Sequence, residues 1–209
     1  MTSPASSGRP AVAYQGVAGA FSELAIEQLW SSRVQGRPCA TFDEVAAVVR
    51  DGGAPLGLLP IENSIAGPVQ ASLAVIAGSG LTVLGSTQMT ITLCLLGVPG
   101  ASLQSLRTAE SHAVALRQCD VFLRAHPWIA PQVSGDTAAA AASVALSGDQ
   151  SRGAIASSRA GALYGLTVLV EGIEDRSDNT TRFVVIGARD ALSLFRALDE
   201  TGESASLQR

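Results

Sequence analysis

The chain has 209 residues and a formal net charge of −4, with 47% hydrophobic and only 15% charged residues. This length allows one large domain or two lobes of roughly 100 residues each. The acidic balance argues against nucleic acid as the main partner, because phosphate binding needs a concentrated basic face. All fourteen basic residues are arginines, which excludes Schiff-base chemistry on lysine and a P-loop lysine. An anionic ligand must therefore bind arginine, hydroxyls, amides or backbone N–H groups.

Residues 63–106 carry no charged side chain, but glycines, prolines and glutamines interrupt them. No window reaches the roughly 20 consecutive apolar residues of a membrane span, so we expect an interior helix followed by long strands and no membrane partner. The three cysteines are far apart, and with the two histidines they do not indicate a metal site. The N-terminus lacks a signal-peptide pattern, so we expect a disordered leader over residues 1–10 and a reducing, cytoplasmic location.

Apolar periodicity and capping residues predict strands that alternate with helices along the whole chain. In the first half we expect, in order, a strand at 11–15, helices at 23–30 and 42–50, a strand at 56–60, a helix at 69–77 and strands at 81–84 and 89–98. In the second half we expect a strand at 108–111, helices at 112–125 and 137–146, a strand at 153–156, a helix from 157 or 158 to about 165, and strands at 167–170 and 181–187. Thr41 and Asp136 are predicted N-caps, and Ser22 with Glu23 opens the first helix. From residue 188 we expect a tail of one or two helical turns and then disorder.

This alternation predicts the α/β class with mostly parallel sheets. The uncharged strands near residues 81–98 are long enough to run from one lobe to another, and the last strand could run back. We therefore expect two α/β lobes with a cleft between them. The expected division gives the first lobe residues 11–85 and 181–190, the second lobe residues 86–180, and a tail at 191–209.

Ligands of open α/β folds bind beyond the carboxyl ends of the strands. The segments predicted there nearly all place a hydroxyl at a helix N-terminus, where orphan N–H groups favour an anion. They include Ser22, Ser64, Ser111 and Thr137. Each hydroxyl alone is typical of a plain helix cap, but the set together predicts a site for a small anionic ligand.

Two segments depart from plain capping. Glu62-Asn-Ser64 follows a buried strand; it is either a surface turn or the site of a partly desolvated Glu62 that donates a proton. Asn179-Thr-Thr-Arg-Phe183 is either a strand start with an exposed Arg182 or a segment that places Arg182 against a carboxylate.

Six blocks of this sequence resemble the catalytic domain of prephenate dehydratases, in the same order and with similar spacing. The resemblance covers about residues 11–190. The blocks are Tyr14 to Glu23, Leu59 to Ile65, Glu110-Ser-His112 with Gln118-Cys119, Asp136-Thr-Ala138, Ala154 to Ser157 with Leu163 to Leu166, and Asn179-Thr-Thr-Arg-Phe183.

The resemblance implies two α/β lobes similar to type II periplasmic binding proteins. It also implies removal of water and CO2 from prephenate to give phenylpyruvate for phenylalanine biosynthesis, by a homodimer or larger homo-oligomer that needs no cofactor. Thr181 matches the family's key catalytic residue, and we expect it to hydrogen-bond and orient the departing C4 hydroxyl. Glu62 is the expected proton source. The expected substrate-binding residues are Ser22, Asn63, Ser64, Ser111, Gln118, Thr137, Arg182 and Phe183.

The sequence also departs from the family pattern. Ala113 and Val114 follow Ser111-His112 where Pro-Gln is usual, Ser86 stands for a common Glu, and Leu93 for a common His. The chain ends soon after residue 190, so we expect no phenylalanine-sensing ACT domain. These departures leave a non-aromatising prephenate decarboxylase as an alternative, beside arogenate dehydratase and a bilobal binding module without enzymatic activity.

Overall fold

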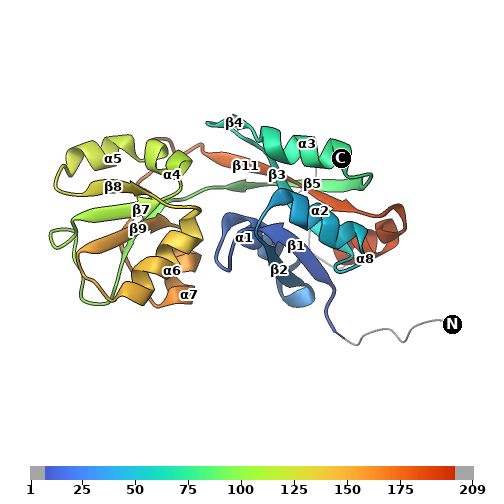
Figure 1. The fold of residues 1–209 in the computed structure, drawn as a ribbon, viewed down its shortest axis with the longest axis horizontal. Helices are drawn as coiled ribbons and strands as arrows, with labels where there is room; N and C mark the ends of the chain where they lie inside the picture. The colour runs from blue at the N-terminus through green and yellow to red at the C-terminus, as the bar shows by residue number, and fades with distance from the viewer. Residues whose placement is uncertain (1–7, 201–209) are drawn as a thin grey trace.

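Two α/β lobes lie side by side, each built on one β-sheet (Figure 1). The structure is a computed structural model that describes residues 8–200. Most of the expected leader (residues 1–7) and the end of the expected tail (201–209) therefore lie outside the described residues. The two-lobed α/β class predicted from the sequence is confirmed.

The first lobe holds a six-stranded sheet in the order β2-β1-β3-β11-β5, with β4 paired to β3. Its strands are β1 (Ala11–Gln15), β2 (Gln35–Cys39), β3 (Leu56–Asn63), β4 (Gly67–Pro68), β5 (Thr82–Thr90) and β11 (Thr180–Gly187). Its helices are α1 (Phe21–Trp30), α2 (Phe42–Arg50), α3 (Gln70–Gly78) and α8 (Leu192–Glu200), with the short 3₁₀ helices η1 (Ser31–Arg33) and η2 (Arg189–Ala191).

The second lobe holds a five-stranded sheet in the order β10-β6-β9-β7-β8. Its strands are β6 (Cys94–Gly97), β7 (Thr108–Ser111), β8 (Ala130–Val133), β9 (Arg152–Ala156) and β10 (Thr167–Glu171). Its helices are α4 (Ala113–Gln118), α5 (Asp120–Ala125), α6 (Thr137–Ser147) and α7 (Ser158–Tyr164). No helix within residues 8–200 is long and apolar enough to cross a membrane.

Both sheets are mixed, so the prediction of mostly parallel sheets is wrong. In the first lobe β1 pairs in parallel with β2 and β3, whereas β11 pairs antiparallel with β3 and with β5. In the second lobe β6 is antiparallel to both of its neighbours. The reason is the crossing between lobes: a strand that leaves one sheet and a strand that returns to it run in opposite directions.

Two chain segments cross between the lobes and are bonded to each other. The first connects β5 to β6, and the second connects β10 to β11. Ile91 donates its N–H to the carbonyl of Asn179 (2.8 Å), Ile173 donates to the carbonyl of Leu93 (3.0 Å), and Leu93 donates to the Glu174 carboxylate (2.8 Å). The lobes are therefore joined by a two-stranded connection rather than by one flexible linker.

Most predicted helix starts are confirmed by their caps. The side chains of Thr41, Asp136 and Ser157 accept N–H groups from the first turns of α2, α6 and α7. The predicted opening of α1 by Ser22 is wrong, because the N-cap is Ala20 and Ser22 lies buried inside the first turn. The single helix predicted at 112–125 is divided at Cys119, whose φ of −115° and ψ of 24° leave the helical region.

The main apolar cluster extends across both lobes, while a smaller one lies under α2 and α3. Part of the expected tail belongs to this core. Phe195 and Leu198 of α8 are buried. The Phe195 ring packs edge-to-face against the Trp30 ring, with 6.3 Å between the ring centroids. The tail expected at 191–209 thus contains a packed amphipathic helix up to residue 200.

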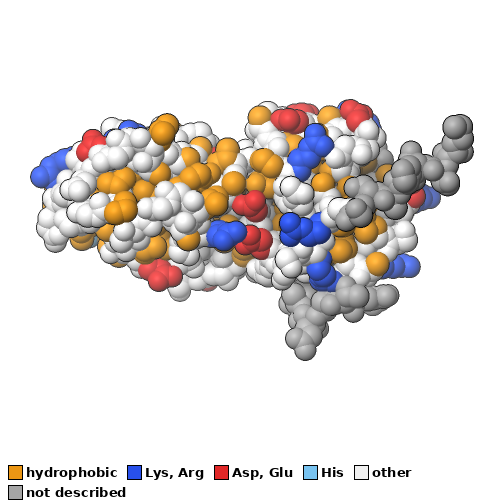
Figure 2. Space-filling view, turned by 90° about the horizontal axis from the view of Figure 1, so that it is seen from below, with side chains coloured by type: hydrophobic (Ala, Val, Ile, Leu, Met, Phe, Trp, Pro, Cys, Tyr) orange, Lys and Arg blue, Asp and Glu red, His pale blue; other side chains and the backbone are white. Residues whose placement is uncertain are grey.

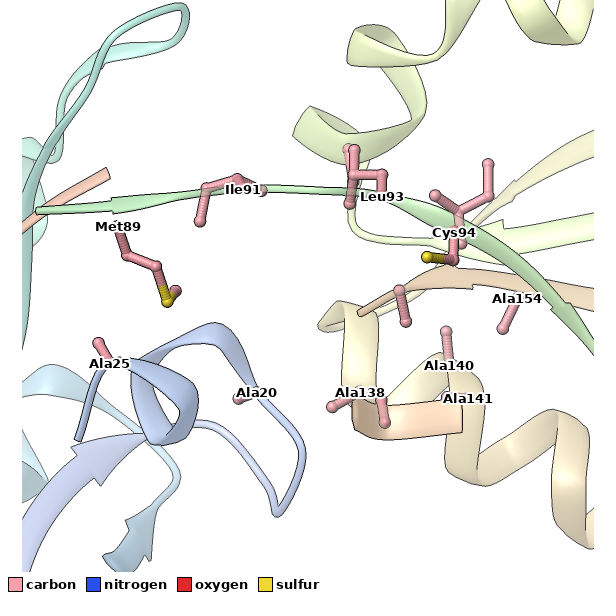
Figure 3. Packing of buried hydrophobic residues seen from close by; sticks show 14 of the residues in the cluster. Ala20, Ala25, Met89, Ile91, Leu93, Cys94, Ala138, Ala140, Ala141 and Ala154 are labelled. Atoms are coloured by element: carbon pink, nitrogen blue, oxygen red, sulfur yellow. The ribbon is translucent and has the colours of Figure 1, made fainter. Parts of the chain in front are cut away.

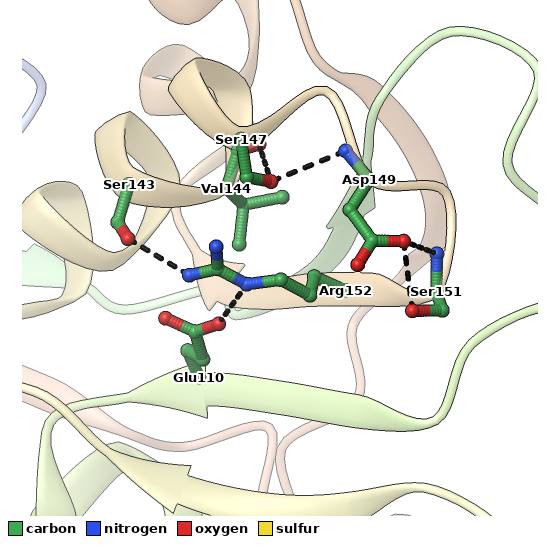
Figure 4. A network of polar contacts seen from close by, with 7 residues as sticks. All are labelled: Glu110, Ser143, Val144, Ser147, Asp149, Ser151 and Arg152. Atoms are coloured by element: carbon green, nitrogen blue, oxygen red, sulfur yellow. Dashed lines mark hydrogen bonds and ion pairs between the residues drawn. The ribbon is translucent and has the colours of Figure 1, made fainter.

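Glu110, which belongs to one of the six sequence blocks, has a structural partner in the second lobe (Figure 4). Arg152 donates from Nε to the buried Glu110 carboxylate (2.7 Å) and from a terminal nitrogen to Ser143 Oγ of α6 (2.9 Å). This ion pair ties α6 to strands β7 and β9.

Candidate active site

A cleft of about 590 Å³ lies between the lobes. Residues of both lobes line it. From the first lobe come parts of the loop after β1, of the loop before α2 and of α3, and from the second lobe come His112 and the start of α6. Ser22 and Thr137, two of the predicted substrate-binding residues, are part of this lining.

Four helices of at least nine residues begin on the cleft. Its lining includes N-terminal residues of α1, α2, α3 and α6, namely Phe21, Phe42, Ala71 and Thr137. Each helix N-terminus carries about half a positive charge and N–H groups without a partner inside the helix, of which one is capped by Thr41 in α2 and one by Asp136 in α6. Among residues 8–200 no arginine lines this cleft, whereas Asp43 and Asp136 do, so the helix starts are the groups on it that attract a carboxylate.

A group of buried apolar side chains lies beside the crossing segments (Figure 3). Met89 at the end of β5 and Ile91 in the first crossing segment project toward the space above Ala20 and Ala25 of the first lobe, with Ala138 of the second lobe nearby. All five are buried. Of these five residues, Ala20 lines the cleft and the other four lie beside it.

Thr181 faces the same side of the sheet as Met89. The two residues are direct partners in the antiparallel pairing of β11 with β5, and Thr181 is also paired with Asn63 of β3. Residues directly opposite each other in such a pair project to one face. Thr181, which is only 9% exposed, is therefore directed toward the region between the crossing segments and α1.

Three carboxamides surround this position. Asn63 Nδ2 lies within hydrogen-bond distance of Asn179 Oδ1 (2.8 Å), Thr181 Oγ1 (3.0 Å) and the Thr180 carbonyl (3.1 Å). Gln118 Nε2 donates to Asn63 Oδ1 (3.3 Å), and Asn179 Nδ2 donates to Gln118 Oε1 (3.2 Å). Because Gln118 ends α4 of the second lobe, these contacts join the two lobes.

Glu62 and Arg182 lie on the opposite face of the sheet, and Arg182 is exposed at the start of β11, as one of the two alternatives for its segment expected. Their side chains alternate with Asn63 and Thr181 along the strands. Glu62 is half exposed, not desolvated, and its carboxylate accepts from Arg182 at 2.9 Å. The structure does not bring Glu62 to Thr181, and the carboxylate beside Arg182 belongs to the protein itself.

Three further predicted contact residues have structural partners instead. Ser64 Oγ donates to the carbonyl of Asp178 and accepts from the N–H of Thr180. Ser111 is fully buried and donates to the Ile155 carbonyl at 2.6 Å. Phe183 is buried in the main core. These side chains hold strands and turns, and they do not line the cleft.

On the side away from the crossing segments, residues 16–20 form a loop that we call the clasp loop. Tyr164 donates its hydroxyl to the Ala18 carbonyl (2.7 Å), and Ser157 donates to the Gly19 carbonyl (3.1 Å). Gly19 has a φ of +88°, and a Cβ there would lie 3.0 Å from the backbone of Ala160. Glycine is therefore required both by the backbone conformation and by the close approach to α7.

Charge also joins the lobes on this side. In the view from below, acidic and basic side chains meet where the lobes adjoin (Figure 2). Arg159 of α7 pairs with Glu27 of α1 at 2.8 Å. Burial raises the pKa of the Tyr164 hydroxyl, and the carboxylates of Asp136 and Glu23 raise it further. Tyr164 therefore stays a neutral donor to the clasp loop.

Sequence reasoning did not single out Asn179 as a site residue, although it lies in a block that was recognised. Its side chain is fully buried and bonded to both Asn63 and Gln118. The spacing could have predicted its place in the site. Asn179 and Thr181 are two residues apart at the start of a strand, so both side chains project to one face.

The fold and the cleft define the class of two-lobed α/β proteins with a cleft between the lobes. A periplasmic substrate-binding protein from Coxiella burnetii shares this fold, with a TM-score of 0.50 at 12% identity over 94% of this chain and 92% of that chain. Within this class, the chain belongs to the prephenate dehydratase family, whose model, described as prephenate dehydratase, matches residues 12–191. The family resemblance identified from the six blocks is confirmed.

Two relatives are 36–37% identical to this chain in sequence. A bifunctional N-acyl-homoserine lactone acylase/prephenate dehydratase from Komagataeibacter europaeus is 37% identical over 88% of this chain and 65% of its own length. Arogenate dehydratase 1 from Petunia hybrida is 36% identical over 84% of this chain and 41% of its own length. Among solved structures, a prephenate dehydratase from Arthrobacter aurescens in complex with L-Phe has a TM-score of 0.79 at 31% identity, over 85% of this chain and 60% of that chain. The chain thus spans less than two thirds of these relatives.

Proposed function

We propose that this chain catalyses the decarboxylating dehydration of prephenate to phenylpyruvate. Membership of the family supports this proposal, and the position of Thr181 carries it. The Thr181 hydroxyl accepts a hydrogen bond from Asn63 and lies on the same sheet face as Met89, although Thr181 itself is not among the residues that line the cleft. A hydroxyl has one hydrogen, and Asn63 Nδ2 cannot accept it, so Thr181 keeps that hydrogen for a substrate oxygen.

The reaction needs a hydrogen-bond donor for the departing oxygen, a surrounding that favours loss of CO2, and a binding position for the second carboxylate. The C4 hydroxyl departs as hydroxide, which takes up a proton to become water, while the ring carboxylate leaves as CO2 and the ring becomes aromatic. Thr181 donates a hydrogen bond to the departing oxygen, and the proton comes from solvent. Loss of a negatively charged carboxylate as neutral CO2 is favoured beside apolar groups such as Met89 and Ile91, because the charged form is poorly solvated there.

The second carboxylate of prephenate needs a separate binding position. The starts of α1 and α6, with Ser22 and Thr137, offer N–H groups and hydroxyls on the polar side of the cleft. Binding that carboxylate there orients the ring toward Thr181. In this assignment Glu62 is not the proton source, since it is half exposed and paired with Arg182 on the other face of the sheet.

The test is the product. The purified chain, given prephenate without added metal or nucleotide, should release an aromatic keto acid that is followed by its NMR spectrum. A product that has lost CO2 but retains its hydroxyl on a non-aromatic ring would instead support the decarboxylase. Competition between prephenate and arogenate as substrates decides between the two dehydratase activities, because several relatives are named arogenate dehydratases.

A second candidate is acylase activity, since one relative is named both an N-acyl-homoserine lactone acylase and a prephenate dehydratase. A hydroxyl and an imidazole, Ser22 and His112, both line the cleft. However, His112 Nδ1 accepts the N–H of Val114 at 3.3 Å, so the uncharged ring carries its hydrogen on Nε2 and has no free lone pair with which to act as a base. Release of a fatty acid from an acyl-homoserine lactone, abolished by Ser22→Ala, is the outcome that would support this candidate.

We also propose that the protein works as a homodimer or larger homo-oligomer in a reducing, cytoplasmic compartment. The oligomer rests on the family resemblance, and light scattering after size-exclusion chromatography measures it directly. The compartment is supported by the three cysteines, which are all buried and unpaired. Burial raises the pKa of the Cys119 thiol, so it stays protonated and unreactive.

A further inference from the structure

The carboxamides of Asn63, Gln118 and Asn179 form a closed ring of hydrogen bonds, which we call the amide ring. Gln118 donates to Asn63, Asn63 donates to Asn179, and Asn179 donates to Gln118. Every member donates once and accepts once within the ring. The direction of donation around it therefore has to be the same at all three residues.

Backbone groups outside the ring fix that direction at Asn63. The N–H groups of Ile65 (3.1 Å) and Ala66 (2.8 Å) donate to Asn63 Oδ1, and an N–H cannot accept. At the other end, the Thr180 carbonyl meets Asn63 Nδ2 at 3.1 Å, and a carbonyl cannot donate. A rotated Asn63 carboxamide would place like groups against each other at both ends, so only one orientation satisfies these contacts.

The orientation then passes through Asn179 to Gln118. Because Asn63 presents Nδ2 to Asn179, Asn179 must present Oδ1 in return, and its Nδ2 is directed to Gln118. Gln118 must accept with Oε1, which leaves Nε2 for Asn63 Oδ1. Asn179 is fully buried, so water cannot replace it in this role.

We propose that Asn179 is a positioning residue, which passes the orientation of Asn63 in the first lobe to Gln118 in the second. This proposal rests on the proposed function, because its consequence for catalysis is the orientation of the Gln118 carboxamide toward the substrate. Asn63 Nδ2 also lies 3.0 Å from Thr181 Oγ1, which can only accept from it, so the Thr181 hydrogen is left for another acceptor. Asn179 itself touches no substrate in this arrangement.

The Asn179→Asp variant tests this role, because its effect depends on pH in a particular way. An ionised aspartate cannot donate to Gln118 Oε1, so the ring cannot close. A protonated carboxyl accepts with one oxygen and donates with the other, and it restores the direction of the original ring. Burial raises the pKa of the introduced carboxyl toward the range in which the enzyme is assayed. Activity lost at high pH should therefore return at low pH.

Other titrating groups surround this position and are present in both proteins, so the ratio of variant to wild-type kcat removes their effects. The residues of β5 and β6 carry no charged side chain. The charged and titratable groups nearby, on the second crossing segment, after α4 and on the far face of β3 and β11, are Glu174, Asp175, Arg176, Asp178, Cys119, Glu62 and Arg182.

We expect kcat of Asn179→Asp to be about a hundredfold below wild type at pH 8, the scale of a misplaced catalytic group, with KM changed far less. The ratio should rise at least about tenfold toward pH 5. Asn179→Ala should lose activity without this recovery, and the exposed Gln132→Glu should show a flat ratio near one. A flat ratio for Asn179→Asp, or wild-type activity throughout, would overturn the proposal. Circular dichroism at each pH excludes unfolding as the cause.

A second measurement needs no turnover, so it separates failure of this proposal from failure of the proposed function. The chain contains only two asparagines, Asn63 and Asn179, and side-chain ¹⁵N labelling of asparagine therefore reports on the ring alone. In the wild type both NH2 groups should exchange slowly with water. In Asn179→Asp the chemical shift of the Asn63 side-chain NH2 group should change with pH, and the midpoint of that change should be the pKa of the introduced carboxyl. Fast exchange in the wild type, or a pH-independent Asn63 signal in the variant, contradicts the ring whether or not prephenate is the substrate.

Discussion

The two lobes meet on opposite sides of the cleft through contacts of different kinds. Beside the crossing segments, the amide ring is made of groups that both donate and accept, so the state of one member determines the next. At the clasp loop, two hydroxyls donate to two carbonyls, and neither bond depends on the other. Changes in the ring should therefore alter turnover, whereas changes in the clasp should alter lobe closure and stability.

The largest expected effect lies beside the ring, at Thr181. Thr181→Val keeps the shape and β-branching of the side chain and removes the hydroxyl. We expect a loss of about 3 kcal/mol of transition-state stabilisation, roughly a hundredfold and mostly in kcat. Thr181→Ser keeps the oxygen and should lose much less. Steady-state kinetics of the two variants measure this difference, and an active Thr181→Val enzyme would remove the proposed role.

The next effect concerns the clasp loop. Gly19→Ala adds a Cβ 3.0 Å from the Ala160 backbone at a φ of +88°, and we expect about 2 kcal/mol of lost stability. Gly52→Ala is the matched control, because Gly52 has a φ of +76° but nothing within 4 Å of an added Cβ. The difference between the two variants in urea unfolding measures the contact with the second lobe alone. Equal losses of stability in the two variants would show that backbone strain alone accounts for the effect of Gly19→Ala.

A smaller effect is expected for Tyr164→Phe, which leaves the Ala18 carbonyl without its donor. We expect about 1 kcal/mol of lost stability and a higher KM with kcat nearly unchanged. An unchanged KM together with a fall in kcat would contradict the division of roles between clasp and ring.

The same contact predicts a pH dependence. Burial raises the folded-state pKa of Tyr164 above its unfolded value. Its contribution to stability is therefore fully present below the unfolded pKa of about 10 and is lost as pH rises through the folded pKa. In alkaline denaturation curves, Tyr164→Phe should show a weaker loss of stability over this range than the wild type does. Parallel curves would argue against a neutral Tyr164 donor.

The smallest effect is expected at Glu62. Glu62→Gln removes a charge from a half-exposed pair with Arg182, and such pairs contribute little. We expect kcat to change about threefold or less, in contrast to Thr181→Val. A loss as large as that of Thr181→Val would return Glu62 to the role of proton source.

The sequence predicted those elements whose signals are local. The caps at Thr41 and Asp136 each place a side-chain oxygen on an N–H three residues later, and both helices start where expected. The strands β2 and β8 were missed, because they are edge strands that expose most of their residues and each contains a proline. They form through pairing with β1 and β7, which no local pattern reveals.

The site was predicted in part for the same reason. Asn63, Gln118 and Thr181 were named from the blocks, and the structure brings them together. Glu62 was misassigned because the strand β3 was expected to end before it, as part of a turn. Once β3 extends to Asn63, alternation places the neighbours Glu62 and Asn63 on opposite faces.

The most direct test of the account is the position of a bound substrate analogue. A ring-saturated analogue of prephenate, which keeps both carboxylates and the C4 hydroxyl but cannot become aromatic, should be crystallised with the chain. We predict that its C4 oxygen lies within about 2.6–3.2 Å of Thr181 Oγ1, with one carboxylate at the starts of α1 and α6. An analogue that instead turns a carboxylate to Thr181, or binds outside the cleft, would contradict the proposed mechanism.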